Sequence, residues 1–499
     1  AGSASGAAGD SNSQNGQENV DNSGNQTGGS QETEVKPVLP EEKDYEYFYD
    51  KETGKFKVTF NIKEDAKGDQ TIELSKVMEE ILALRHELAQ LLGFENYAFK
   101  SLATKMAENP QQVLDFLTDL AKRARPQGEK ELAQLRAFAK AEFGVDELQP
   151  WDIAYYSEKQ KQHLYSISDE QLRPYFPENK AVNGLFEVVK RIYGITAKER
   201  KDVDVWHPDV RFFELYDENN ELRGSFYLDL YARENKRGGA WMDDCVGQMR
   251  KADGSLQKPV AYLTCNFNRP VNGKPALFTH DEVITLFHEF GHGLHHMLTR
   301  IETAGVSGIS GVPWDAVELP SQFMENWCWE PEALAFISGH YETGEPLPKE
   351  LLDKMLAAKN YQAALFILRQ LEFGLFDFRL HAEFRPDQGA KILETLAEIK
   401  KLVAVVPSPS WGRFPHAFSH IFAGGYAAGY YSYLWADVLA ADAFSRFEEE
   451  GIFNRETGQS FLDNILSRGG SEEPMDLFKR FRGREPQLDA MLEHYGIKG

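Results

Sequence analysis

The chain has 499 residues, of which 42% are hydrophobic, and it carries a formal net charge of −23 at pH 7. A chain of this length can bury a large core and form two or three domains. Its negative charge argues against nucleic acids and anionic membrane surfaces as partners, because both would repel it.

The first 71 residues differ in composition from the rest. Residues 1–40 are mostly Ser, Asn, Gln, Gly and acidic residues, so they have almost nothing to bury, and we predict that they are disordered. Residues 45–62 alternate between apolar and polar side chains around an Asp-Lys-Glu-Thr-Gly turn, which predicts a β-hairpin. We expect no secretory signal, since the basic and apolar segments of one are missing.

From residue 72 onward the hydrophobic spacing is mainly helical, as in residues 78–92 and 110–143. Strand-like segments interrupt this pattern at residues 212–216, 224–232 and 260–267. After residue 281 the pattern is again almost entirely helical. We therefore predict a mainly α-helical fold with a small β-sheet.

The most informative motif is the H-E-x-x-H pattern His288-Glu289-Phe290-Gly291-His292. On a helix, residues i and i+4 lie on one face, so both imidazoles can bind one metal ion while Glu289 accepts a proton from water. Thr279 and Glu282 form a capping box that predicts where this helix begins. The alternative is an amphipathic surface helix whose histidines bind no metal.

The same helix carries an apolar stripe and two glycines. Gly291 and Gly293 each cost roughly 1 kcal/mol relative to Ala in a helix, which is tolerated where a substrate backbone or another helix must come close. The stripe predicts that the helix is buried beside the predicted sheet, and it consists of Val283, Phe287, Phe290, Leu294 and Met297.

A hydrolytic zinc site needs three protein ligands and an open position for water. The extended motif with a third histidine is excluded, because His295 and Leu298 stand where its Gly and His would be. The third ligand is therefore expected on another element.

Residues 314–327 supply the candidates for this ligand. We predict a helix here that is capped by Asp315, with Glu318, Gln322 and Glu325 on one polar face. The spacing favours Glu318 over Glu325 without excluding either, and an ordinary solvated face is the alternative.

A segment rich in Gly and Tyr follows near residue 420. Tyr426, Tyr430 and Tyr433 have the spacing of one helix face, and Gly424 and Gly425 allow the preceding loop to change shape. A positioned tyrosine hydroxyl or histidine N–H can donate to the oxyanion that forms when a peptide bond is attacked. The alternative is that these tyrosines are ordinary core aromatics.

These motifs together resemble the thimet oligopeptidase family of zinc peptidases. The resemblance runs from about residue 81 to residue 499. It rests on three segments, which are His288-Glu289-Phe290-Gly291-His292, Glu318-Leu319-Pro320-Ser321-Gln322 with Glu325-Asn326-Trp327, and the run from Ser419 to Trp435.

The resemblance implies a zincin-type fold and a role for each motif. It implies one zinc ion per chain, with Glu289 as the general base and Glu325 as a carboxylate that orients a ligand histidine. The implied zinc ligands are His288, His292 and Glu318. The implied contacts to the substrate carbonyl are His420, Tyr426 and Tyr433. We add Tyr430, Gly424 and Gly425 as substrate-binding candidates.

The chain departs from the family before residue 72. Relatives carry a long helical region that forms the opposite wall of a channel over the zinc, and here a tail and a hairpin stand in its place. We therefore divide the chain into a disordered tail (1–40), a hairpin segment unlike the family (41–71) and a catalytic region (72–499).

Cysteine content and hydropathy predict the location. Cys245, Cys265 and Cys328 are an odd number without a C-x-x-C pair, which indicates reduced thiols and a cytoplasmic protein. Apolar runs are too short to span a membrane. We expect short peptides as the binding partners, and neither nucleic acid, membrane nor an obligate protein partner.

We predict a zinc endopeptidase that hydrolyses short, unstructured peptides. In this hypothesis Glu289 takes a proton from the attacking water and passes it to the leaving amine, while His420 and Tyr433 stabilise the oxyanion. Strand 260–267 is expected to pair with the substrate backbone.

Three alternatives stay open. The first is a dipeptidyl carboxypeptidase of the same family, with Arg413 as the candidate for binding the substrate C-terminus. The second is a zinc-binding protein that is inactive because the channel wall is missing. The third is a structural helical protein with a coincidental H-E-x-x-H motif.

Overall fold

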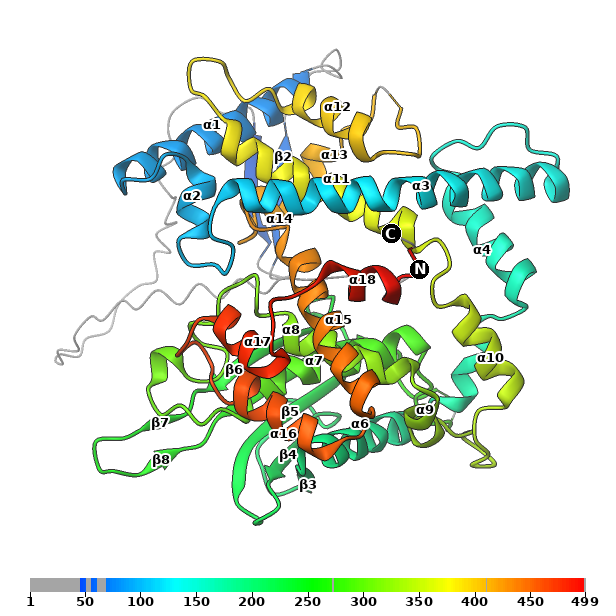
Figure 1. The fold of residues 1–499 in the computed structure, drawn as a ribbon, viewed down its shortest axis with the longest axis vertical. Helices are drawn as coiled ribbons and strands as arrows, with labels where there is room; N and C mark the ends of the chain where they lie inside the picture. The colour runs from blue at the N-terminus through cyan, green and yellow to red at the C-terminus, as the bar shows by residue number, and fades with distance from the viewer. Residues whose placement is uncertain (1–44, 51–54, 61–68, 272, 410, 498–499) are drawn as a thin grey trace, which may run out of the picture.

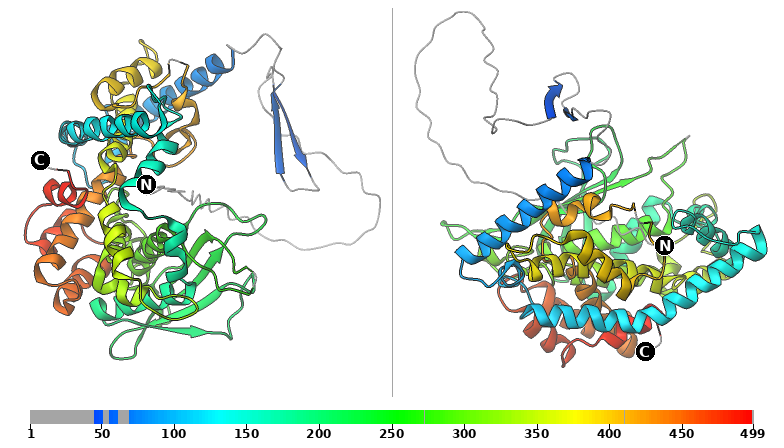
Figure 2. Two further views of the ribbon diagram at one scale, coloured as in Figure 1. Left: turned by 90° about the vertical axis from the view of Figure 1, so that its right-hand side faces the viewer. Right: turned by 90° about the horizontal axis from the view of Figure 1, so that it is seen from above.

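The computed structural model describes residues 45–50, 55–60, 69–271, 273–409 and 411–497. The main body has two lobes, each with its own apolar core (Figures 1 and 2). The predicted disordered tail lies outside the described residues. Among the described residues, no helix is long and apolar enough to cross a membrane.

The first of the two lobes, which we call the sheet lobe, contains a five-stranded sheet and the helices that cover it. The sheet consists of β3 (Thr196–Arg200), β4 (Arg211–Tyr216), β5 (Leu222–Tyr231), β6 (Trp241–Val246) and β9 (Val260–Phe267). The short strands β7 (Met249–Arg250) and β8 (Leu256–Gln257) form a separate hairpin. The main helices are α6 (Glu178–Tyr193), α7 (His280–Met297), α8 (Leu319–Glu325), α9 (Pro331–Ile337), α16 (Arg455–Phe461) and α17 (Pro474–Arg482).

The second, the helical lobe, lies above the sheet lobe in Figure 1. Its helices are α1 (Asp69–Leu91), α2 (Tyr97–Leu102), α3 (Pro110–Phe143), α11 (Ala363–Glu383), α12 (Ile392–Val403), α13 (Phe414–Ala417), α14 (Ser419–Phe422) and α18 (Leu488–His494). Helices α4 (Ile153–Tyr165) and α10 (Lys349–Ala358) lie at the right-hand side of Figure 1, and the single turn α5 (Asp169–Leu172) follows α4.

Helix α15 (Ser432–Glu450) belongs to both cores. Leu434, Val438 and Ala441 are four and three residues apart and face the core of the helical lobe. Leu439 and Phe444 lie on another side of the helix and are buried in the sheet lobe. The helix therefore ties the two lobes together.

The strand order of the sheet is β3-β4-β5-β9-β6, with β5 and β9 parallel and the other neighbours antiparallel. Phe226 of β5 pairs with Phe213 of β4 and with Ala261 of β9. Because β9 is paired on both sides, the prediction that residues 260–267 pair with a substrate strand is wrong. The edge strands of the sheet are β3 and β6.

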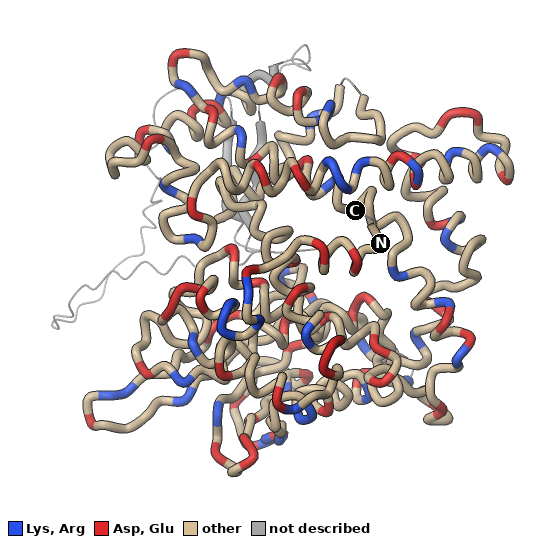
Figure 3. Tube along the Cα trace, viewed as in Figure 1, with Lys and Arg blue, Asp and Glu red and all other residues tan. Residues whose placement is uncertain are grey.

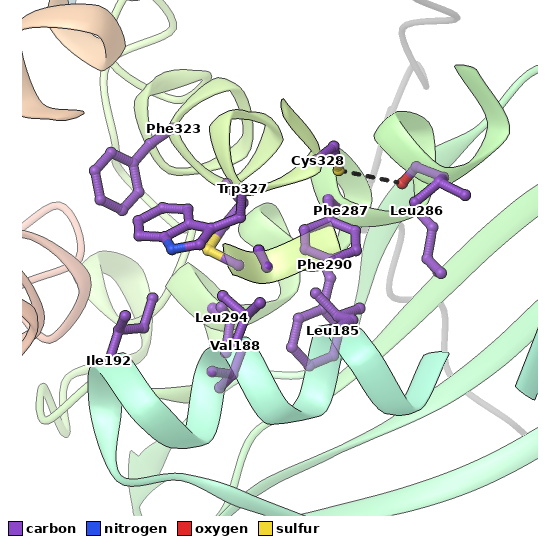
Figure 4. Close-up of a cluster of buried hydrophobic side chains, with 14 of the residues drawn as sticks. Leu185, Val188, Ile192, Leu286, Phe287, Phe290, Leu294, Phe323, Trp327 and Cys328 are labelled. Atoms are coloured by element: carbon purple, nitrogen blue, oxygen red, sulfur yellow. Dashed lines mark hydrogen bonds between the residues drawn. The ribbon is translucent and has the colours of Figure 1, made fainter. Parts of the chain in front are cut away.

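Apolar packing holds α7 in the interior of the sheet lobe. Leu185 and Val188 of α6 lie below Phe290 and Leu294 of α7, and Trp327 covers them from the opposite side (Figure 4). All five residues of the predicted apolar stripe are at most 1% exposed, which confirms that the helix is buried: Val283, Phe287, Phe290, Leu294 and Met297.

The predicted hairpin near the N-terminus is present. Strands β1 (Tyr45–Asp50) and β2 (Lys55–Phe60) are antiparallel, with Tyr47 opposite Val58. The mainly helical fold with a small sheet beside the H-E-x-x-H helix is likewise as predicted.

Candidate metal centre

The capping box predicted for α7 fixes where the helix begins. The Oγ1 of Thr279 accepts a hydrogen bond from the N–H of Glu282 at 3.0 Å, and a carboxylate oxygen of Glu282 accepts one from the N–H of Thr279 at 2.8 Å. Two and three turns further on, His288 and His292 share one face, with their ring centroids 5.0 Å apart.

Helix α8 approaches α7 at Gly291. A Cβ atom on Gly291 would lie 2.4 Å from the carbonyl oxygen of Pro320, so any larger residue would push the two helices apart. The sequence predicted that either a substrate backbone or another helix comes close to the glycines of α7. At Gly291 it is another helix, α8. Glu318 stands directly before α8, whose first turn contains Pro320.

The segment before α8 differs from the prediction. Residues 314–318 form turns, and α8 begins at Leu319. Asp315 does not cap the helix, because its carboxylate accepts hydrogen bonds from the backbone N–H groups of Met106 and Ala107 and from the hydroxyl of Tyr431.

Three potential ligand atoms converge in the space between α7 and α8. Oε2 of Glu318 lies 3.2 Å from Nε2 of His288 and 3.1 Å from Nε2 of His292. Among the described residues, these three form the group within 4.8 Å of one another that could hold a metal ion. Two imidazole nitrogens and one carboxylate oxygen match the ligand set of catalytic zinc sites.

Glu325 occupies a different position from Glu318. Its Oε1 lies 2.6 Å from Nδ1 of His288. A carboxylate can only accept, so His288 carries a proton on Nδ1, and its Nε2 faces Glu318. The geometry favours Glu318 as the third ligand, since its Oε2 lies near both Nε2 atoms while Glu325 contacts only Nδ1 of His288.

Charge and burial act in opposite directions on these groups. Burial alone would lower the pKa of His288, but the carboxylates of Glu318 and Glu325 raise it well above its ordinary value. Burial would likewise raise the pKa of Glu318, but His292 and His288 hold it well below its usual range. Glu318 is therefore anionic at neutral pH and suited to bind a cation.

Glu289 has the opposite electrostatic character. Burial raises its pKa above that of an ordinary carboxyl group, and the nearby His288 and His292 only partly offset this. The side chain is 6% exposed and lines the cavity over the ligand atoms. A carboxylate with a raised pKa is a stronger base, as proton transfer from water requires.

A cavity of about 1360 Å³ lies between the two lobes. Its lining includes the three potential ligands His288, His292 and Glu318 together with Glu289. Residues from both sequence motifs line it, together with the edge strand β6. From the aromatic segment, the lining residues are His420, Tyr426, Tyr430 and Tyr433. Gly424 and Gly425 are not among the described residues that line it, and their role in substrate binding stays a prediction.

The aromatic segment is packed as a cluster of rings. Tyr426 and Tyr433 stack with centroids 5.1 Å apart, and His420 contacts Tyr430 at 5.5 Å. Burial, followed by the neighbouring Tyr426 and Glu318, raises the pKa of Tyr433, so its hydroxyl stays protonated and can donate. The rings therefore both pack in the interior and line the cavity.

The helical spacing predicted for these tyrosines does not describe their backbone. Helix α15 begins only at Ser432, and residues 423–431 form turns in which Ala428 has a φ of +49°. The hydroxyl of Tyr430 donates to Oε1 of Gln370 at 2.9 Å.

A hydrogen-bonded pair near Glu325, formed by a carboxyl group and a tyrosine hydroxyl, could not be predicted from the sequence patterns. The hydroxyl of Tyr495 donates to Oδ2 of Asp437 at 2.7 Å, across 58 residues of sequence. Burial raises the pKa of Asp437 to about 7. Both residues line a small cavity behind Glu325 that measures about 70 Å³.

The basic residue proposed for binding a substrate C-terminus lies elsewhere. Arg413 is exposed and is not among the described residues that line the cavity. Arg369 does line it, with Glu372 at 2.9 Å and its guanidinium stacked over Phe373. Acidic and basic residues are interspersed along both lobes (Figure 3).

A mainly helical fold, with an H-E-x-x-H helix beside a small sheet and a glutamate directly before α8, defines the zincin-like metallopeptidase fold. The chain belongs to peptidase family M3, whose sequence profile matches residues 58–497.

Several relatives and solved structures are similar to the chain. Oligopeptidase A of Salmonella typhimurium is 96% identical over 85% of this chain and 62% of its own length. Oligopeptidase A of Haemophilus influenzae is 74% identical with the same coverage, and dipeptidyl carboxypeptidase of Escherichia coli is 38% identical over 84% of this chain and 62% of its own length. The chain thus spans about 62% of the length of these curated relatives.

Solved structures agree on the fold. A structure of PZ peptidase A with an inhibitor has a TM-score of 0.52 at 16% identity, covering 86% of this chain and 65% of that one. The M32 carboxypeptidase of Deinococcus radiodurans has a TM-score of 0.51 at 15% identity, covering 86% and 76%.

Proposed function

We propose that the chain is a zinc-dependent endopeptidase for short, unstructured peptides. The observation that carries this proposal is the convergence of His288, His292 and Glu318 beside the buried base Glu289, within a cavity large enough for an extended peptide. The family and the oligopeptidase A relatives support the same activity.

Zinc, when bound to the three ligands, lowers the pKa of a water molecule toward about 7 and polarises the carbonyl under attack. Glu289 accepts the proton of the attacking water, and because its protonated form is favoured by burial it can return that proton to the leaving amine. Tyr433 and His420 face the cavity as donors for the oxyanion.

The edge strand β6 offers a binding mode for the peptide backbone. It ends the five-stranded sheet, and Trp241, Met242, Asp243 and Asp244 line the cavity. A peptide that adds to this edge gains main-chain hydrogen bonds whatever its sequence, which suits an enzyme with broad substrates.

Endopeptidase activity is preferred over dipeptidyl carboxypeptidase activity. The latter needs a cation within the cavity to bind the terminal carboxylate, and Arg413 is not among the described lining residues. Other cations do line the cavity, namely Lys161, Arg237, Lys359 and Arg369. The preference therefore rests on the relatives, since the two oligopeptidase A sequences are 96% and 74% identical to the chain and the dipeptidyl carboxypeptidase is 38% identical. Free thiols at Cys245, Cys265 and Cys328 are in keeping with the cytoplasm as the proposed location.

Wild type and Glu289→Gln, assayed on a pool of peptides of about five to fifteen residues, test this proposal. The variant removes the base but keeps the size of the side chain, so turnover should fall by about 10²–10⁴ while zinc stays bound. Internal cleavage by the wild type supports an endopeptidase, and release of C-terminal dipeptides alone supports the alternative. Bound zinc without cleavage by the wild type would make the chain an inactive zinc-binding protein.

A further inference from the structure

The loop that carries the cavity tyrosines has a strained backbone. Within the tyrosine loop, which we define as residues 426–431, Ala428 adopts the left-handed conformation with φ of +49° and is fully buried. This conformation is unfavourable for an alanine, so surrounding contacts must hold it in place.

A single buried carboxylate supplies most of these contacts. Asp377 of α11 is completely buried, and its Oδ1 accepts a hydrogen bond from the N–H of Ala428 at 2.8 Å. Its Oδ2 accepts bonds from the N–H groups of Gly429 and Tyr430, both at 2.9 Å. Three consecutive amides of the strained loop thus point at one side chain.

A fixed chain of hydrogen bonds stands behind Asp377. Nη1 of Arg85 lies 3.1 Å from Nε2 of His381, and an arginine can only donate, so Nε2 accepts and Nδ1 carries the proton. That Nδ1 lies 2.7 Å from the carbonyl oxygen of Asp377 and 3.1 Å from its Oδ1. Helix α1 therefore supports the carboxylate through His381.

The tyrosine loop is also held from its other side. The hydroxyl of Ser101 donates to the carbonyl oxygens of Ala427 and Ala428, at 3.2 and 3.0 Å. Donors and acceptors of the loop backbone are therefore both satisfied by buried side chains, as the interior demands.

We propose that Asp377 is a positioning residue. It holds the tyrosine loop in the conformation that presents Tyr426, and Tyr433 in the first turn of α15 directly after the loop, to the proposed metal ligands. Asp377 is not among the described residues that line the cavity, so it acts through the loop rather than on the substrate. The catalytic half of this inference, that the loop position affects turnover, rests on the proposed function. The structural half, that Asp377 holds the loop, does not depend on it.

Hydrogen–deuterium exchange tests the structural half without any activity. In Asp377→Asn the amide group can accept fewer of the three backbone hydrogen bonds, so peptides covering 426–431 should exchange at least tenfold faster than in wild type. The matched control is Asp442→Asn, since Asp442 is equally buried and binds Arg484 and the N–H of Gln487 instead. In the control, exchange in the tyrosine loop should be unchanged.

Kinetics test the catalytic half. Asp377→Asn should keep its zinc and lower kcat by about 10–100-fold with a smaller change in KM, because a displacement of about 1 Å can cost 10²-fold. In the double variant with Tyr433→Phe, the effects should be less than additive, because both changes remove the same donor from its place. Asp442→Asn should leave kcat of the folded protein within twofold.

The inference is overturned if Asp377→Asn folds with wild-type exchange in the tyrosine loop, or if the loop is loosened while kcat is unchanged. If Asp377→Asn does not fold, Ser101→Ala replaces it, because it removes one hydroxyl from the same loop, and wild-type exchange and kcat in that variant would equally overturn the inference. A wild type that shows the protected loop but cleaves no peptide contradicts the proposed function and leaves the holding role of Asp377 supported.

Discussion

The metal-binding side of the cavity and its tyrosine side are held in place by different interactions. In the sheet lobe, α7 is packed between α6 and α8 by apolar side chains, and Gly291 allows α8 to come close (Figure 4). In the helical lobe, the tyrosine loop contains a left-handed Ala428 and is held by hydrogen bonds to Asp377. Close packing resists small displacements, whereas hydrogen bonds can be exchanged for bonds to water.

The difference suggests a division of work between the two sides. Metal ligands must keep their geometry at all times, and a densely packed core provides this. Groups that stabilise an oxyanion must be in position when the substrate is bound, and the hydrogen bonds from Asp377 to the tyrosine loop provide this. The first two predictions below perturb one side and also measure the other, and the last two measure stability.

The largest effect is expected for the proposed metal ligands. His292→Ala or Glu318→Ala should empty the zinc site and abolish peptide cleavage, as measured by metal analysis and turnover, because two ligands do not make a closed site. The tyrosine loop should keep wild-type hydrogen exchange. Glu325→Ala is the matched control and should weaken zinc binding by only about 10–100-fold. Zinc loss in Glu325→Ala but not in Glu318→Ala would reverse the assignment.

Tyr433→Phe perturbs the other side. Removal of one oxyanion donor should lower kcat by about 10²–10³-fold with little change in KM and full zinc content. Tyr430→Phe is the control, since its hydroxyl is bound to Gln370, and it should have a smaller effect. An unchanged kcat in Tyr433→Phe would assign the cluster a packing role and leave His420 as the donor.

Gly291→Ala tests the dense packing of the metal-binding side. Its Cβ would lie 2.4 Å from the backbone of Pro320, so we expect a loss of about 1–3 kcal/mol in unfolding free energy and weaker zinc binding. Gly293→Ala is the control, because its nearest neighbour is a Leu263 methyl group at 3.2 Å that can move. Equal unfolding temperatures and zinc affinities for the two variants would contradict the close approach of the helices.

The smallest effect concerns Asp437, whose pKa burial raises to about 7. The folded protein keeps this proton at pH 6 while the unfolded chain has released it, so wild type should lose stability as the pH rises to 8. The unfolding free energy should fall by at most about 1.4 kcal/mol between these pH values, and water in the cavity reduces this effect further by screening the charge.

Asp437→Asn cannot release a proton and should not show this loss. Thermal unfolding at pH 6 and pH 8 compares the two proteins. A difference between variant and wild type that stays constant with pH would show that the folded protein does not titrate Asp437 in this range.

Local patterns predicted much of the fold. Helix α3 has the predicted limits of 110 and 143, and the capping box correctly gave the start of α7. Strand β6 was not predicted, because Asp243 and Asp244 on this exposed edge break the apolar pattern that indicates a strand. The adjacent β9 was predicted as a strand from its apolar run, but the same run could not show that both its edges are paired.

The candidate site likewise contains residues that local patterns could predict and residues that they could not. The spacing of His288 and His292 follows from helix geometry, so the pair could be predicted. Asp315 was interpreted as a helix cap because local rules allow it, whereas its partners Met106 and Tyr431 lie far away in sequence. Asp377 has no local signal at all, since only the folded chain brings the tyrosine loop to it.

The contacts of Asp315 also bear on how the protein folds. Its carboxylate joins Met106, 209 residues earlier, to Tyr431, 116 residues later. Closing such long loops is slow, because the chain must lose much entropy before the contact forms. During synthesis the metal ligands leave the ribosome well before the tyrosine loop that faces them. Completion of the cavity is therefore a late event, which a nascent chain cannot reach until its C-terminal part has been made.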